Sequence, residues 1–134
     1  MLILICGRPR AGKTTLSTYF KCIVAHADYI QYSGCAIATK RNDKICCEGI
    51  FSSSASRNMI LNEANGYKIC VWLDTSRDLR QKRLGITELW HDDYFRPPTL
   101  DEGWDKIIIV KDNDYKNAEV IMKDSNLKGD LADG

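Results

Sequence analysis

The stretch GRPRAGKTT, residues 7–15, directly follows the apolar run LILIC and constrains this chain more than any other feature. Leu2 to Cys6 is short, apolar and without helical periodicity, which is typical of a strand buried on both faces of a parallel sheet. Gly7 to Thr14 fit the spacing G-x-x-x-x-G-K-[ST], and Thr15 to Val24 are predicted to form an amphipathic helix. A strand, a glycine-bounded loop and a helix in this order predict a phosphate-binding loop.

The residue types in this loop suit a triphosphate. Successive backbone N–H groups form a concave anion site, which bulky side chains at Gly7 or Gly12 would obstruct. We predict that Lys13 reaches the terminal phosphates and that the Thr14 hydroxyl binds Mg²⁺. The residues expected to line the nucleotide site are Gly7, Arg8, Pro9, Arg10, Ala11, Gly12, Lys13, Thr14 and Thr15.

Composition describes an ordinary globular protein. With 134 residues the chain is expected to form one domain, and its net charge of +1 gives no overall polycation that would favour nucleic acid. Six cysteines are present, but four of them lie in apolar strand-like runs, where cysteine acts as a small hydrophobic residue: Cys6, Cys46, Cys47 and Cys70. No C-x-x-C motif, secretory signal or apolar membrane-spanning run is found. We therefore expect the protein to reside in the reducing cytoplasm.

Strand and helix patterns alternate after the loop. Asp28 to Tyr32 (DYIQY) is predicted to be the second strand, followed by a polar, basic loop at residues 33–44. Three more strands are predicted at Ile45 to Ile50, Lys68 to Asp74 and Ile107 to Val110. Helices are predicted from a serine cap at residues 52–54 to Asn65-Gly66, and from Ser76 to Leu84. This alternation predicts an α/β fold with a mostly parallel sheet.

The domain is expected to cover residues 1–112, with a short lid at about residues 84–98. Residues 113–134 form a polar segment, in which we expect one helix near Lys116 to Lys123 and a frayed end.

Acidic side chains beyond the loop are candidates because ligands bind at the carboxyl ends of parallel strands. Glu48 lies near the end of the third predicted strand and is expected to hold Mg²⁺ through water or to contact an acceptor. Asp74 ends the fourth strand, where it is expected to start the next helix. Asp28 opens the second predicted strand, which puts it at the opposite edge of the sheet from the ligand.

Basic and aromatic residues complete the candidate set. Arg80 and Arg83 share a helix face at i, i+3 and are candidates to neutralise charge on a transferred phosphoryl group, although a solvated helix face is the alternative. Arg57 is a candidate for binding an acceptor phosphate. In the expected lid, Trp90 and Tyr94 are candidates for stacking on a base.

Four segments carry a resemblance that spans about residues 1–110: GRPRAGKTT after LILIC, ICCEGIFSSSASR, ICVWLDTSRDLRQKR and FRPPTLDEGWDKIIIV. Together they resemble small P-loop kinases of the polynucleotide kinase type, especially short phage-encoded ATP-binding proteins with an AAA domain. The resemblance implies a three-layer fold with strand order 2-3-1-4-5. It also implies ATP with Mg²⁺, and transfer of the γ-phosphoryl group to a polynucleotide 5′-hydroxyl or another small acceptor.

One departure from that family leaves alternatives open. Polynucleotide kinases of this type carry an acidic general base just beyond the second strand, but here the predicted strand is followed by Ser33 and Gly34. Either Asp28, Asp43 or Glu48 takes that role, or the acceptor is a phosphate that needs no base. The competing functions are a nucleoside or nucleotide kinase, and an ATP-binding switch or accessory protein without efficient transfer.

Overall fold

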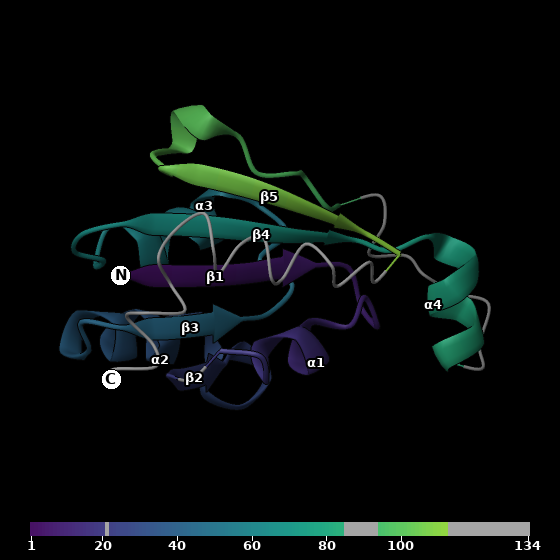
Figure 1. Ribbon diagram of the computed structural model, residues 1–134, viewed down its shortest axis with the longest axis horizontal. Helices are drawn as coiled ribbons and strands as arrows, with labels where there is room; N and C mark the ends of the chain where they lie inside the picture. The colour runs from purple at the N-terminus through teal and green to yellow at the C-terminus, as the bar shows by residue number, and fades with distance from the viewer. Residues whose placement is uncertain (21, 85–93, 113–134) are drawn as a thin grey trace.

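The structure, a computed structural model, describes residues 1–20, 22–84 and 94–112. Its strands form one parallel sheet in the order β2-β3-β1-β4-β5, with β1 in the centre (Figure 1). The strands are β1 (Leu2–Gly7), β2 (Ile23–His26), β3 (Ile45–Glu48), β4 (Lys68–Asp74) and β5 (Lys106–Lys111). The predicted α/β fold and the strand order 2-3-1-4-5 are confirmed.

Two hydrophobic clusters cover the two faces of the sheet, because alternate residues of β1 point to opposite sides. Ile3 and Ile5 join the cluster beneath helix α1, whereas Leu2, Leu4 and Cys6 join the cluster beneath α2 and α3. The helices are α1 (Lys13–Ser17), α2 (Ala27–Arg41), α3 (Ser54–Leu61) and α4 (Arg77–Leu84), with a short 3₁₀ helix, η2, at Leu100–Glu102. No helix of the described residues combines the length and apolarity that crossing a membrane requires.

The cysteines of the strands are core residues, as predicted. Cys6, Cys46, Cys47 and Cys70 are buried and have free thiols. The thiols of Cys6 and Cys70 lie 3.8 Å apart on neighbouring strands. These cysteines therefore fill space between the sheet and the helices.

The region between α1 and β3 differs from the prediction. The second strand is Ile23–His26, which pairs in register with β3, and the predicted strand from Asp28 to Tyr32 is wrong. That run instead begins α2, which also occupies most of the predicted loop at residues 33–44. The aromatic and β-branched residues of DYIQY favoured a strand. Asp28 instead lies in the first helical turn, where an acidic side chain is favourable.

Helix α1 is shorter than the predicted helix from Thr15 to Val24. It ends at Ser17, whose hydroxyl donates to the Thr14 carbonyl at 2.6 Å, and the Thr18 hydroxyl donates to the Thr15 carbonyl at 2.7 Å. Hydroxyl groups that bond to carbonyls of the preceding turn weaken a helix. The chain then tightens through i to i−3 backbone hydrogen bonds and enters β2.

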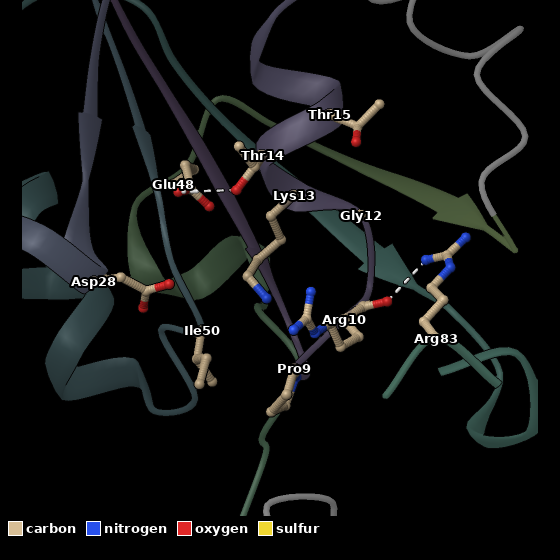
Figure 2. Close-up of a pocket in the computed structure, with 10 residues that line it drawn as sticks. All are labelled: Pro9, Arg10, Gly12, Lys13, Thr14, Thr15, Asp28, Glu48, Ile50 and Arg83. Atoms are coloured by element: carbon tan, nitrogen blue, oxygen red, sulfur yellow. Dashed lines mark hydrogen bonds between the residues drawn. The ribbon is translucent and has the colours of Figure 1, made fainter. Parts of the chain in front are cut away.

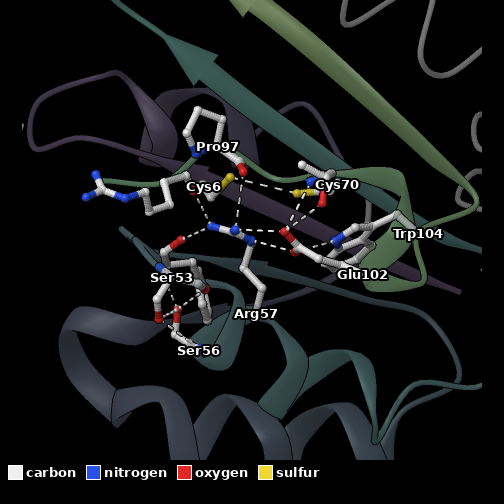
Figure 3. A network of polar contacts seen from close by, with 11 residues as sticks. Cys6, Ser53, Ser56, Arg57, Cys70, Pro97, Glu102 and Trp104 are labelled. Atoms are coloured by element: carbon white, nitrogen blue, oxygen red, sulfur yellow. Dashed lines mark hydrogen bonds and ion pairs between the residues drawn. The ribbon is translucent and has the colours of Figure 1, made fainter. Parts of the chain in front are cut away.

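A buried ion pair fastens the segment before β5 to helix α3 (Figure 3). The Arg57 side chain is 1% exposed, and its Nε and Nη2 donate to the two carboxylate oxygens of Glu102 at 2.8 and 2.9 Å. Nη1 donates to the carbonyls of Phe51 and Arg96, each at 2.8 Å, and Nη2 donates to the Pro97 carbonyl at 3.4 Å. Every N–H group of this guanidinium therefore has a partner.

Removing the arginine is expected to cost much of the stability of the fold. Arg57→Ala leaves Glu102, whose side chain is 8% exposed, as a buried charge without its cation. We expect the free energy of unfolding to fall by about 3–5 kcal/mol, measured by urea denaturation followed by circular dichroism. Arg77→Ala, which removes an exposed arginine from α4, should change it by less than about 0.5 kcal/mol. Equal losses in the two variants would contradict this role for Arg57.

The same pair predicts a dependence of stability on pH. Burial disfavours the ionised form of Glu102, but hydrogen bonds from Arg57 and Trp104 outweigh it and lower the pKa of this carboxyl below its ordinary value. A carboxyl with a lowered pKa stabilises the fold above its unfolded pKa of about 4.3, and that contribution is lost as the pH falls through the folded-state pKa.

We therefore expect the urea midpoint of the wild type to fall more steeply than that of Glu102→Gln below about pH 5. The Gln variant should be less stable at pH 7, because it lacks the carboxylate that pairs with Arg57. Urea titrations from neutral to acid pH measure both effects. Parallel curves for the two proteins would show that Glu102 does not contribute to the acid sensitivity.

Candidate active site

A cavity of about 710 Å³ opens at the carboxyl edge of the sheet, beside the loop that follows β1 (Figure 2). Its size is in the range of ligand-binding pockets, about 300–1,000 Å³. The described residues that line it are Pro9, Arg10, Gly12, Lys13, Thr14, Thr15, Asp28, Glu48, Ile50 and Arg83. The structure thus brings most of the predicted loop residues together with Glu48 and Arg83.

The predicted loop residues that do not line the cavity are buried or contact neighbouring segments. Gly7 and Ala11 are buried, and the Arg8 guanidinium lies over the Phe95 ring at 5.0 Å from its centroid. The Thr75 hydroxyl, which follows β4, donates to the Ala11 carbonyl at 2.7 Å. These contacts fix the loop against β4 and the segment that precedes β5.

The two glycines of the loop are required for different reasons. A Cβ at Gly7 would lie 2.9 Å from the Leu73 carbonyl oxygen, so β4 excludes a side chain there. Gly12 has a φ of 100°, a left-handed conformation in which a residue with a side chain would be strained. The loop therefore needs Gly7 for its close approach to the neighbouring strand and Gly12 for its backbone conformation.

Lys13 points into the cavity from the start of α1 (Figure 2). Its Nζ donates to the Arg8 carbonyl at 2.9 Å. Burial lowers the pKa of this amine, and the nearby carboxylates of Glu48 and Asp28 only partly oppose the effect. A desolvated ammonium group with one carbonyl partner gains a strong interaction when an anion occupies the cavity.

The side chains of Thr14 and Glu48 meet in the lining of the same cavity. Glu48 ends β3 and is 3% exposed, and its Oε1 accepts a hydrogen bond from the Thr14 hydroxyl at 3.4 Å. The same oxygen lies 2.7 Å from Nδ1 of His26. His26 ends β2. Because the second strand was predicted at the wrong residues, the sequence did not indicate that His26 lies beside Glu48.

The donor set suits Mg²⁺. A hydroxyl and a carboxylate oxygen are hard oxygen ligands, and Mg²⁺ is commonly bound by one or two protein groups together with substrate phosphates. Within the described ranges, no group of three or more His, Cys, Asp or Glu side chains is arranged to hold a metal ion. The residues Thr14 and Glu48 therefore fit a Mg²⁺ ion that is shared with a phosphate ligand.

Asp28 lies at this edge of the sheet, and its predicted position at the opposite edge is wrong. It follows β2 by two residues, is exposed and lines the cavity from the first turn of α2 (Figure 2). An acidic residue therefore does stand just beyond the second strand. In the sequence, the indication of this position is the short run Ile23–His26, which forms the second strand and ends two residues before Asp28.

The predicted pair of arginines on α4 is divided between two environments. Arg83 lines the cavity, and its Nη1 donates to the Arg10 carbonyl at 2.8 Å (Figure 2). Arg80 is 1% exposed, and its Nε donates to the Thr75 carbonyl at 3.0 Å. The expectation that both arginines face the ligand is therefore not supported for Arg80, which is not among the described residues that line the cavity.

Two further expectations concern residues outside the described lining of the cavity. The prediction that Arg57 binds an acceptor phosphate is wrong, because its N–H groups are all engaged by Glu102 and by backbone carbonyls. Tyr94 is 66% exposed. Trp90 and most of the predicted lid lie outside the described residues, as does the helix predicted near residues 116–123.

Comparisons with solved structures identify proteins that share this fold. No known protein family and no curated protein sequence matches the chain. The structure is similar to that of an unliganded sugar kinase from Janibacter sp. HTCC2649, with a TM-score of 0.75, 13% identity, and 97% of this chain and 96% of that chain covered. It is also similar to a protein provisionally described as a kinase from Chloroflexus aurantiacus, with a TM-score of 0.60, 16% identity, and 96% of each chain covered. The chain therefore has the fold of these kinase structures.

Proposed function

We propose that this chain is an ATP-dependent phosphotransferase that uses Mg²⁺ and transfers the γ-phosphoryl group of ATP to a hydroxyl group. The observation that carries the proposal is the convergence of Lys13, Thr14, Glu48 and Asp28 on one cavity beside a glycine-bounded loop. The kinase fold of the similar structures supports the same class of reaction.

The triphosphate would lie along the loop, where backbone N–H groups face it. Lys13 would exchange the Arg8 carbonyl for phosphate oxygens, and Arg83 would reach the same phosphates from α4. Mg²⁺, when bound by Thr14 and, directly or through water, by Glu48, would neutralise charge on the β- and γ-phosphate oxygens. His26 would orient the Glu48 carboxylate through their 2.7 Å contact.

In the transfer step, a lone pair of the acceptor hydroxyl oxygen forms a bond to the γ-phosphorus. The bond between that phosphorus and the β,γ-bridging oxygen breaks, and ADP leaves with the electron pair. Asp28 accepts the hydroxyl proton, because it is the exposed carboxylate among the described residues that line the cavity.

A base at this position favours a hydroxyl acceptor over a phosphate acceptor, because a phosphate oxygen is already ionised. The sequence resemblance implies a polynucleotide 5′-hydroxyl, which is one such acceptor, and a nucleoside is another. One of the similar structures is that of a sugar kinase, which adds a small hydroxylated molecule to these candidates. An ATP-binding switch would need no base, so Asp28 also favours transfer over binding alone.

Lys13→Ala is expected to lower ATP turnover by about 10²–10³-fold, because it removes the cation that faces the terminal phosphates. ADP release measures the rate, and circular dichroism checks that the fold is intact. Lys40→Ala, an exposed lysine near the end of α2, should retain wild-type turnover. Wild-type turnover by Lys13→Ala would remove this cavity as the nucleotide site.

Asp28→Asn is expected to lower kcat by about 10²–10⁴-fold while ATP affinity stays nearly constant, because the variant removes the proton acceptor but no phosphate contact. ATP binding is measured by calorimetry and transfer by ADP release. Asp78→Asn, an acidic residue in the first turn of α4, is the matched control and should leave kcat unchanged. A kcat equal to that of wild type in Asp28→Asn would rule out the base.

A further inference from the structure

A second cavity of about 230 Å³ adjoins the first, and the inference drawn from it rests on the proposed function. Its lining residues are Ala27, Asp28, Gln31, Tyr32 and Ile50. Asp28 and Ile50 line both cavities, so the second one continues the first on the α2 side. Figure 2 shows Asp28 and Ile50 on one side of Lys13, and Arg83 on the other side. The second cavity therefore lies on the side away from Arg83, next to the proposed base.

The described lining residues of the second cavity are uncharged apart from the carboxylate of Asp28. Ala27 and Ile50 are apolar, Gln31 carries an amide and Tyr32 carries a phenol. Among the described residues that line the second cavity, none is Lys, Arg or His. A phosphate group bound here would lie against the Asp28 carboxylate without a compensating cation, which is unfavourable. The lining thus selects against an anionic acceptor.

The Tyr32 side chain is oriented before any ligand binds. Its ring stacks on Phe51 with centroids 4.5 Å apart, and its oxygen accepts a hydrogen bond from the Phe51 N–H at 3.0 Å. Burial raises the pKa of this phenol, so it remains protonated. With its oxygen held by Phe51, the phenol can donate its hydrogen to a ligand in the cavity.

Gln31 lines the cavity with a strained backbone. Its φ of 64° and ψ of 175° interrupt α2 and fall in a region that is almost confined to glycine. A glycine would adopt this conformation more easily, yet the position carries an amide that both donates and accepts hydrogen bonds. Strain of this kind clusters at ligand-binding sites.

We propose that the second cavity binds the acceptor, and that the acceptor is a small, uncharged polyhydroxy compound of the polyol or monosaccharide class. Gln31 and Tyr32 bind hydroxyl groups that do not react, while Asp28 takes the proton of the hydroxyl that attacks the γ-phosphorus. The products are ADP and a phosphate monoester of the acceptor. The volume of about 230 Å³ is below the range of pockets for drug-sized ligands, about 300–1,000 Å³, which suits a molecule of this size.

The test supplies γ-³²P-ATP, Mg²⁺ and one acceptor at a time: polyols, monosaccharides, nucleosides, nucleoside monophosphates or an oligonucleotide with a 5′-hydroxyl. Label is expected only in polyols or monosaccharides. Label in the oligonucleotide, a nucleoside or a nucleotide overturns the inference but leaves the proposed phosphotransferase intact. ATP binding without label in any polyol or monosaccharide also overturns the inference. Absence of ATP binding by calorimetry contradicts the proposed function itself.

Two variants of one residue separate ligand contact from backbone strain. Gln31→Gly and Gln31→Ala both remove the amide, and each should raise the KM for the labelled polyol or monosaccharide about tenfold with the KM for ATP unchanged. Gln31→Gly should melt at a higher temperature than Gln31→Ala, because only glycine relieves the positive φ. An unchanged acceptor KM in both variants would overturn the assignment of Gln31 to the acceptor.

Discussion

The parallel pairing of β1 between β3 and β4 is the constraint on which the site depends. All residues of β1 are buried, and its register sets Ile5 beside Glu48 and Gly7 beside Leu73. One neighbouring strand therefore delivers the carboxylate next to the loop, and the other bounds the loop where it leaves the sheet. Because three strands end together, the polar side chains at their carboxyl ends need no long reach to meet.

Charge is distributed unevenly around this edge of the sheet. Arg10 and Arg83 lie on the α4 side of the loop, whereas Asp28 and the uncharged lining of the second cavity lie on the α2 side (Figure 2). Lys13 stands between the two sides. In the proposed reaction, this division holds a polyanionic nucleotide on one side and an uncharged hydroxyl compound with its base on the other.

Local patterns predicted the central strands and the loop, because a buried strand such as Lys68–Asp74 is an apolar run with clear ends. Among the described strands, the edge strand Ile23–His26 pairs only with β3, and it is partly exposed. Its pattern was therefore weaker than that of DYIQY, and Asp28 was misplaced as a result. Arg57 was misassigned for a different reason. Its partner Glu102 lies 45 residues further along the chain, and only the tertiary structure brings them together.

The central claim is that the loop after β1 holds a triphosphate whose Mg²⁺ lies between Thr14 and Glu48. A crystal structure with a non-hydrolysable ATP analogue and Mn²⁺ in place of Mg²⁺ tests it directly, because anomalous scattering locates the metal. We predict that the β- and γ-phosphates contact Lys13 and that the metal peak lies beside the Thr14 hydroxyl. Phosphates bound elsewhere, or a metal remote from both Thr14 and Glu48, would contradict the account.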